Sequence, residues 1–362
     1  MKFITKDIGS IFPLYEKDYS KTFQKNSPLV KDRVLVSLAR ESFSLIADLH
    51  QNLSKHVLIP AYTCQTCITP FLEKGWNCKF YPITKDLRID TIGLKSLCKD
   101  FQPSIVVVHP YYGMDLSNVE VDALQSLHDD GILLVKDDTQ CIFTTQKLNF
   151  IDYTIGSYRK WFPIPDGGFI QSSNNLSVTF KEDPENNLFY DFQTYSMYLR
   201  GIYFKSGDER VKQISISLNK KAVALVENSI KVHRMSDFSA TILSNENLES
   251  NIMSRNTNFR YLSSHIVNNE FLSSVYHELP DQIIAPLYFP IYVKNRTDLQ
   301  KVLAQNHIYA PILWKVELED VLINNDIADI YDQILVIPID QRYDINDMKK
   351  IVNTINSYYG KM

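Results

Sequence analysis

Residues 104–138 read SIVVVHPYYGMDLSNVEVDALQSLHDDGILLVKDD and decide the fold class. Two short apolar runs, SIVVVHP at 104–110 and ILLVKDD at 132–138, flank a segment that reads as an amphipathic helix. Strands buried on both faces of a sheet read as continuous apolar runs, and parallel strands need a crossover connection. The stretch therefore predicts one strand–helix–strand unit of a parallel sheet.

The same pattern extends from about residue 33 to residue 172. Further apolar runs occur at 34–36, 56–60, 78–83 and 151–155, and segments with helical spacing separate most of them. This alternation predicts an α/β layered domain with a largely parallel sheet. Such sheets bind ligands beyond the carboxyl ends of their strands, so the residues that follow each run are the candidates for a functional site.

The composition excludes several classes of protein. The chain has 362 residues, 44% of them hydrophobic, and a net charge of -4 without a long basic run, which argues against a nucleic-acid partner. The N-terminus has no signal-peptide core, and no run reaches the roughly 18 apolar residues of a membrane span, so we expect a cytoplasmic protein. No glycine-rich dinucleotide or P-loop motif follows a strand.

The five cysteines are an odd number, which predicts free thiols in a protein without a secretion signal. Cys64 and Cys67 form one CxxC motif, and the chain has no second pair of similar spacing. A structural zinc site normally needs that second pair. We therefore expect thiols that are buried or line a site, and no bound metal.

The second half of the chain changes in character. The aromatic-rich segment at 187–204 predicts a helix that packs an aromatic face into a core or a subunit contact rather than against a ligand. Beyond residue 236, helical segments alternate with two apolar strands at 283–293 and 334–340, which predicts a smaller α+β domain. We accordingly divide the chain into an N-terminal segment (1–29), a large domain (30–235) and a small domain (236–362).

Several chemically active residues follow the apolar runs. Taken singly, Asp137 reads as a helix cap, His109 as a core histidine and Lys160 as a surface lysine. Together with Ser157, they match pyridoxal phosphate chemistry: a lysine for the aldehyde, an acid for the ring nitrogen, and a helix N-terminus with a hydroxyl for the phosphate. We also expect the apolar run at 161–163 to shield the lysine amine from water.

The pair LVKDDTQ (134–140) and GSYRKWFPIPDGG (156–168) resembles the DegT/DnrJ/EryC1/StrS aminotransferases, pyridoxal phosphate enzymes of fold type I that act on nucleotide sugars. VLIPAYTCQTCITPFLEKGWNCKFYPI (57–83), VVVHPYYGMD (106–115) and HRMSDFSA (233–240) extend the resemblance to nearly the whole chain. The resemblance implies a large domain with a mainly parallel sheet between helices and a smaller α+β C-terminal domain. It also implies an N-terminal segment near the active site and a homodimer.

The resemblance further implies roles for individual residues. Lys160 and Asp137 are the implied catalytic residues, Lys160 as the Schiff-base lysine and proton shuttle and Asp137 as the partner of the pyridine nitrogen. Ser157 and the backbone amides of Ala39 and Arg40 are expected to bind the phosphate. The ring hydroxyl is expected to lie near Gln140.

Five further residues carry expectations at the same site. Cys64 and Tyr62 are expected to contact the cofactor: Cys64 stands where the family often has an aromatic residue over the cofactor ring, and we expect Tyr62 to take that place. His109 and Tyr112 are expected to line the substrate side. Arg159 faces either solvent or an anionic substrate.

The implied function is transfer of an amino group from an amino acid, glutamate in the first instance, to a keto group on a nucleotide-linked sugar, for surface polysaccharide or related biosynthesis. Another fold type I reaction remains an alternative: an amino-acid aminotransferase, a lyase or a decarboxylase. A degenerate, non-catalytic family member is a third reading. The presence of both Lys160 and Asp137 argues against it, because a pure binding protein needs neither.

Overall fold

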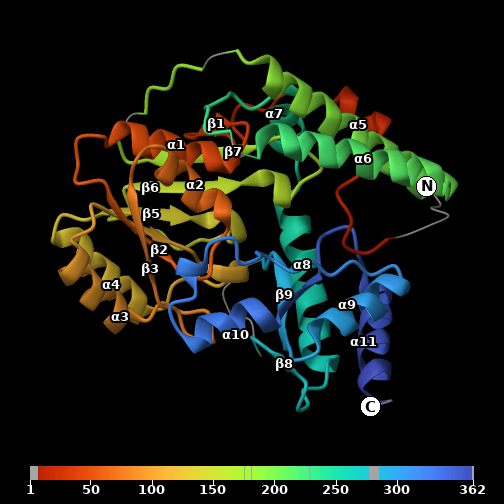
Figure 1. The fold of residues 1–362 in the computed structure, drawn as a ribbon. Coiled ribbons are helices and arrows are strands. Elements are labelled where there is room, and N and C mark those ends of the chain that lie inside the picture. Colours follow the sequence, from red (N-terminus) through yellow and green to blue (C-terminus); the bar gives the residue numbers. More distant parts are fainter. Residues whose placement is uncertain (1–6, 175, 181, 228, 277–284, 361–362) are drawn as a thin grey trace.

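The computed structural model describes residues 7–174, 176–180, 182–227, 229–276 and 285–360. Its larger sheet has seven strands in the order β1-β7-β6-β5-β4-β2-β3 (Figure 1). The strands are β1 (Val34–Val36), β2 (His56–Pro60), β3 (Asn77–Tyr81), β4 (Ile105–Val108), β5 (Leu133–Asp137), β6 (Tyr153–Ser157) and β7 (Gly168–Ser172).

Strands β2 to β6 are parallel to one another, and their apolar runs are largely buried. At one edge, β7 returns antiparallel to β6, and β1 pairs antiparallel with β7. The predicted α/β class with a mainly parallel sheet is confirmed.

Helices cover the larger sheet, as its continuous apolar strands require. α1 (Ala39–Leu49) packs against α2 (Gln65–Glu73), while α3 (Thr91–Phe101) packs against α4 (Asn118–Asp129). Ser117 and Glu120 form a capping box that starts α4, which explains why this helix begins where it does. Residues 104–138 thus form the predicted strand–helix–strand unit.

Two long helices, α5 (Pro184–Ser206) and α6 (Glu209–Val226), pack against each other beside the larger sheet (Figure 1). The aromatic segment at 187–204 is helical as predicted, and it buries Phe189 and Tyr203 within the chain. Tyr195 and Ile214 stay 62% and 53% exposed, so this helix pair also presents apolar side chains to solvent.

A second sheet of three antiparallel strands follows in the order β10-β9-β8. Of the predicted strands, 334–340 forms β10 (Ile334–Pro338) and 283–293 forms β9 (Tyr288–Val293), whereas residues 283–284 lie outside the described residues. The short strand β8 (Leu272–Ser274) was not predicted. The helices of this region are α7 (Asp237–Ser244), α8 (Leu248–His265), α9 (Arg296–Gln305), α10 (Asn325–Gln333) and α11 (Ile345–Tyr359).

Five short 3-10 turns complete the described elements. The five turns are η1 (Glu16–Ser20), η2 (Tyr111–Gly113), η3 (Asp138–Gln140), η4 (Tyr158–Lys160) and η5 (Glu319–Val321). Of these, η3 and η4 directly follow strands of the larger sheet, and η2, η3 and η4 carry candidate site residues.

The N-terminal segment runs between the second sheet and α5. Ile8 forms a parallel bridge with Ile308, and the Gly9 amide donates to the Tyr343 hydroxyl at 2.7 Å. The Leu14 amide donates to the Met197 carbonyl at 3.0 Å. Within the described residues, no helix has the length and apolar character needed to cross a membrane.

Candidate active site

A cavity of about 230 Å³ lies at the carboxyl ends of the parallel strands, where the sequence predicted a site. It brings together the last residues of β5 and β6, the turns η3 and η4 that follow them, and the N-terminal turns of α1 and α2. Nearly all of the predicted site residues line it: Ala39, Arg40, Cys64, His109, Asp137, Gln140, Ser157, Arg159 and Lys160.

One wall of the cavity is the N-terminus of α1. A β-carbon added at Gly168 would lie 2.6 Å from the Ala39 nitrogen, so the glycine allows β7 to approach the helix start. The Gly167 amide donates to the Ser37 carbonyl at 2.7 Å and ties the same two segments together. The first amides of a helix lack partners within the helix and favour anions. Together with Ser157, this end of the cavity suits a phosphate group.

Replacing Gly168 with alanine should push the start of α1 away from β7, because the clashing atoms belong to the backbone. We expect the free energy of unfolding to fall by about 1–3 kcal/mol. Urea titration followed by circular dichroism measures this loss, and anion binding at the cavity should weaken in parallel. A variant as stable as the parent would contradict the tight packing of these segments.

A buried ion pair between Glu41 and His233 stabilises the start of α1. The Glu41 carboxylate accepts hydrogen bonds from the Leu38 amide at 3.3 Å and from His233 Nδ1 at 2.8 Å. His233 Nε2 lies 3.3 Å from an Asp183 oxygen. Burial opposes the charged form of His233, but the two carboxylates outweigh it and raise its pKa. Burial also raises the pKa of Glu41.

This pair predicts a pH dependence of stability. Because both pKa values are raised on folding, the folded state holds protons more tightly than the unfolded state. The stabilisation from His233 is therefore complete below its ordinary pKa of 6.5 and is lost as the pH rises through the higher, folded pKa. Unfolding free energies from urea titrations should fall over that window. A His233→Gln variant should show a flatter profile, and an equally steep one would rule the pair out as the cause.

The opposite wall carries Asp137, the last residue of β5. One of its oxygens accepts the Thr139 amide at 2.9 Å, so it does cap a turn, and the other lies 3.5 Å from His109 Nδ1. The Cys67 thiol donates to this second oxygen at 3.7 Å. His109 Nε2 lies 2.7 Å from the Thr63 hydroxyl, and burial lowers the pKa of His109. A neutral imidazole that accepts from Thr63 presents its Nδ1 hydrogen to Asp137.

Lys160 lies at the end of η4 and has an exposed side chain. The expected apolar shield does not form, because the turn directs the residues after Lys160 into the core. The Trp161 indole donates to the Thr139 carbonyl at 2.8 Å, and the Arg255 guanidinium lies 4.4 Å from the centre of the indole ring. Phe162 is fully buried in the same apolar cluster.

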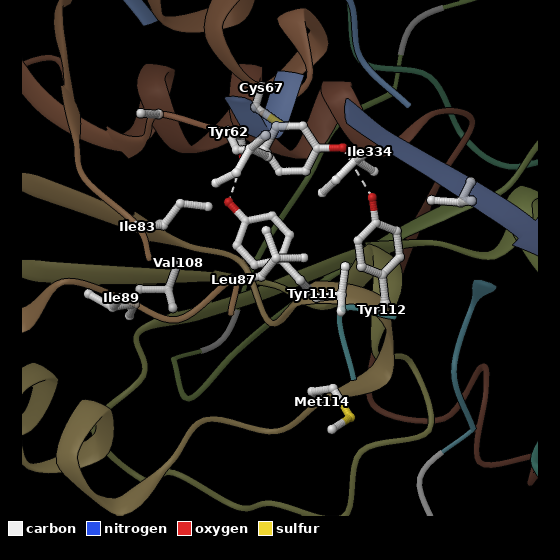
Figure 2. Close-up of a cluster of buried hydrophobic side chains, with 14 of the residues drawn as sticks. Tyr62, Cys67, Ile83, Leu87, Ile89, Val108, Tyr111, Tyr112, Met114 and Ile334 are labelled. Atoms are coloured by element: carbon white, nitrogen blue, oxygen red, sulfur yellow. Dashed lines mark hydrogen bonds between the residues drawn. The ribbon is translucent and has the colours of Figure 1, made fainter. Parts of the chain in front are cut away.

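Tyr62 and Tyr112 do not line the cavity. Their hydroxyls lie 3.1 Å apart in a fully buried aromatic cluster (Figure 2). The Tyr62 hydroxyl also donates to the Leu313 carbonyl. The expected places of Tyr62 over a cofactor ring and of Tyr112 on the substrate side do not fit this position. The strand β2 ends at Pro60, before Tyr62, and the chain then leads into α2.

Trp314 lines the cavity, and sequence reasoning did not identify it. Its ring centre lies 4.6 Å from that of Tyr62 and 6.3 Å from that of His109. The residue comes from a loop far along the chain, with a positive φ of 61° and no local pattern that marks it. Leu38, Pro110 and Thr139, which follow apolar runs of the sequence, also line the cavity, as do Phe43, Thr66 and Cys67, for which the sequence indicated no role at the site.

The side chains of the remaining predicted residues make different contacts. The Gln140 side-chain oxygen accepts the Tyr112 amide at 2.8 Å. Arg40 donates to the Val226 carbonyl at 2.7 Å, so its guanidinium reaches the end of α6. Arg159 is half-buried and lies 5.6 Å from the centre of the Phe189 ring. Burial, and then the charge of Arg40, lower the pKa of Arg159 to about 10.

A second cavity of about 350 Å³ adjoins the first and shares Arg159 and Lys160 with it. Its other walls come from the N-terminal segment, α5 and the second sheet. Arg342 pairs there with Asp340 at 2.7 Å. The Nη2 atom of buried Arg255 has no hydrogen-bond partner among the described residues. Lys160 therefore stands between two cavities that both carry positive charge.

No protein-family model and no curated protein matches this chain. Solved structures do match it. They include PseC of Helicobacter pylori, an aminotransferase involved in the biosynthesis of pseudoaminic acid, with 13% identity, a TM-score of 0.70, and 99% of this chain and 100% of that chain covered. The PLP form of the putative sugar aminotransferase Spr1654 of Streptococcus pneumoniae matches with 13% identity, a TM-score of 0.69, and 98% and 99% covered.

A DegT DnrJ EryC1 StrS aminotransferase from Brucella abortus matches with 15% identity, a TM-score of 0.64, and 91% of this chain and 86% of that chain covered. At such identities the likeness concerns the fold. The match spans both sheets, which confirms the predicted fold type I architecture. This chain has the fold of the DegT/DnrJ/EryC1/StrS aminotransferases.

Proposed function

We propose that the protein is a pyridoxal phosphate-dependent aminotransferase that acts on a keto sugar. The observation that carries the proposal is the meeting of three features in one cavity: the α1 N-terminus beside Ser157, the amine of Lys160 and the buried carboxylate of Asp137. Pyridoxal phosphate supplies an aldehyde that combines with amines and a ring that takes up electrons. The donors and acceptors that line the cavity match its phosphate, aldehyde and ring nitrogen.

Asp137 would hold a proton on the ring nitrogen. Its carboxylate is 8% exposed and is oriented by the Thr139 amide, the Cys67 thiol and His109. These three groups hold the negative charge of the Asp137 carboxylate in a fixed position. A charge fixed in advance stabilises a reaction without reorganisation, which is how preorganised electrostatics contributes to catalysis. His109 acts through Asp137 as a positioning residue.

The Nζ atom of Lys160 would bind the cofactor between turnovers. While it is not attached to the cofactor, this amine would serve as the general base toward the Cα proton of the amino donor and then as the general acid. Its position between the two cavities suits both tasks, since one cavity faces Asp137 and the other is open to a substrate.

The second cavity would take the substrates. Polar side chains such as Ser10, Gln193 and Asn219 line it, together with Arg255. Hydroxyl groups of a sugar and the carboxylate of an amino acid are ligands for such donors. The solved structures with this fold include PseC, an aminotransferase involved in pseudoaminic acid biosynthesis, and the putative sugar aminotransferase Spr1654. We extend the proposal to glutamate as donor, a nucleotide-linked sugar as acceptor, a cytoplasmic location and a role in surface polysaccharide biosynthesis.

The spectrum of the purified protein tests the proposal. With added pyridoxal phosphate, the protein should gain near-visible absorbance, which should decline when glutamate is supplied. Assays with keto-sugar nucleotides and with 2-keto acids then separate a sugar aminotransferase from an amino-acid aminotransferase. Loss of carbon dioxide or of a leaving group in place of amino transfer would favour a decarboxylase or a lyase. A protein that takes up no cofactor would favour a non-catalytic one.

We further propose a homodimer. The α5–α6 pair presents apolar side chains to solvent, including Leu188 at 47% and Tyr195 at 62% exposure. Light scattering after size exclusion should give twice the chain mass of 41.9 kDa. A monomer that remains active would contradict this part of the proposal.

A further inference from the structure

Cys64 and Cys67, the CxxC pair, lie at the first turn of α2 and line the cavity that contains Asp137 and Lys160. Cys64 is the N-cap of the helix, and the Cys67 amide donates to the Cys64 carbonyl at 2.9 Å. A turn closed by this hydrogen bond brings the two Cα atoms within about 7 Å of each other. Disulfides bridge Cα separations of about 4.4–6.8 Å. The backbone therefore already has a shape that a disulfide can close.

The two thiols have different surroundings. Cys64 is partly exposed, its sulfur accepts the Thr66 hydroxyl at 3.0 Å, and the charge of Arg40 interacts with it. The partial exposure of Cys64 lets a small external disulfide reach its sulfur. Cys67 is buried, and burial together with the charge of Asp137 raises its pKa well above the ordinary value. Cys64 is therefore the thiol that can attack an external disulfide. Cys67 is the buried, protonated thiol one helical turn away.

We infer that Cys64 and Cys67 form a reversible disulfide that makes the cavity sensitive to the thiol redox state. The oxidant is a low-molecular-weight disulfide such as glutathione disulfide. The Cys64 thiolate attacks one sulfur of that disulfide, forms a mixed disulfide and releases one small thiolate. The released small thiolate takes the proton of Cys67, and the Cys67 sulfur then displaces the second small thiolate from Cys64. Two protein thiols are oxidised, and one small disulfide is reduced to two thiols.

The disulfide changes the surroundings of Asp137. In the reduced protein the Cys67 thiol donates to the Asp137 carboxylate, and the disulfide has no hydrogen to donate. Losing one donor to a charged group corresponds to roughly a tenfold change in an equilibrium constant. If Asp137 holds the cofactor ring, the oxidised protein should bind pyridoxal phosphate roughly tenfold more weakly. This consequence rests on the proposed function, whereas the disulfide does not.

Peptide mapping tests the disulfide. The full-length protein is equilibrated in glutathione buffers of graded oxidation, quenched with acid and alkylated. A chelator is present because Cys67, His109 and Asp137 place potential metal-binding atoms within 4.8 Å of one another. We expect Cys64 and Cys67 to lose alkylation together and to regain it with dithiothreitol. A Cys78→Ser variant, altered outside the cavity, should behave in the same way, and a Cys64→Ser variant should keep Cys67 labelled after oxidation.

Two outcomes would overturn the inference. One is full alkylation of both cysteines in fully oxidised glutathione. The other is a stable glutathione adduct on Cys64 with Cys67 still alkylated, since Cys67 would then fail to resolve the mixed disulfide.

Cofactor binding is measured separately on the oxidised and the reduced protein. Weaker binding after oxidation, restored by dithiothreitol, supports the effect on the cavity, and equal binding overturns that effect. A reduced protein that binds no cofactor would overturn the proposed function instead. The peptide map would remain valid in that case, so the two failures can be told apart.

Discussion

Replacing Lys160 with alanine should abolish the near-visible absorbance of lysine-bound pyridoxal phosphate and reduce amino transfer by at least roughly 10²- to 10⁴-fold, the range for loss of one general acid–base group. Lys160 is the lysine that lines both cavities, and it supplies the amine for cofactor attachment and for proton transfer in the proposed function. Absorbance titration with the cofactor and a coupled glutamate assay measure the two effects.

The fold should survive this change, because the Lys160 side chain is exposed. We expect the free energy of unfolding to stay within about 0.5 kcal/mol of the parent value. Lys147→Ala, at another exposed lysine, is the matched control and should keep both the absorbance and the activity. Lys160→Arg retains a positive charge but cannot attach the cofactor, so it should lose the absorbance as well. An unchanged spectrum in Lys160→Ala would end the proposal.

Replacing Asp137 with asparagine should slow amino transfer by roughly two to three and a half decades. Losing one partner of a buried charge pair costs about 3–5 kcal/mol, which converts to this range of rates. Asparagine has nearly the same shape and can still accept from the Thr139 amide, but it carries no charge to keep a proton on the ring nitrogen. Single-turnover kinetics of the cofactor-loaded protein measures the loss.

The neighbouring Asp138 provides the control. It is buried, does not line the cavity, and pairs with Lys136 at 3.0 Å. Burial, opposed by Lys136, raises the pKa of Asp138 to about 6. Asp138→Asn should therefore lower the free energy of unfolding, because Lys136 loses its buried partner, while the turnover of the folded protein stays near that of the parent. Near-parental turnover in Asp137→Asn would contradict its catalytic role.

The larger sheet and most of the cavity could be predicted because their signals are local. Residues 105–108 and 133–137 read as buried strands from their own side chains, and 118–129 reads as a helix. The rule that ligands bind at the carboxyl ends of parallel strands then selected Asp137 and Ser157 without knowledge of the packing. The cavity lining includes both.

Other features could not be read in this way. The Trp161 side chain points into the core because of the turn at η4. The direction of the Tyr62 side chain depends on where β2 ends. Trp314 reaches the cavity through the path of a distant loop, which no neighbouring residue indicates. The exposure of the Lys160 side chain likewise depends on how far it is covered by segments that are distant in the sequence.

The sequence alone determined the alternation of strands and helices and the order of the residues at the strand ends, because burial on both faces of a sheet restricts side chains locally. Only the tertiary structure decided which of those residues face one cavity, how Cys64 and Cys67 lie beside Asp137, and that Lys160 stands between two cavities. Such relations depend on the packing of segments that are distant in sequence, and side-chain direction follows the backbone path that this packing selects.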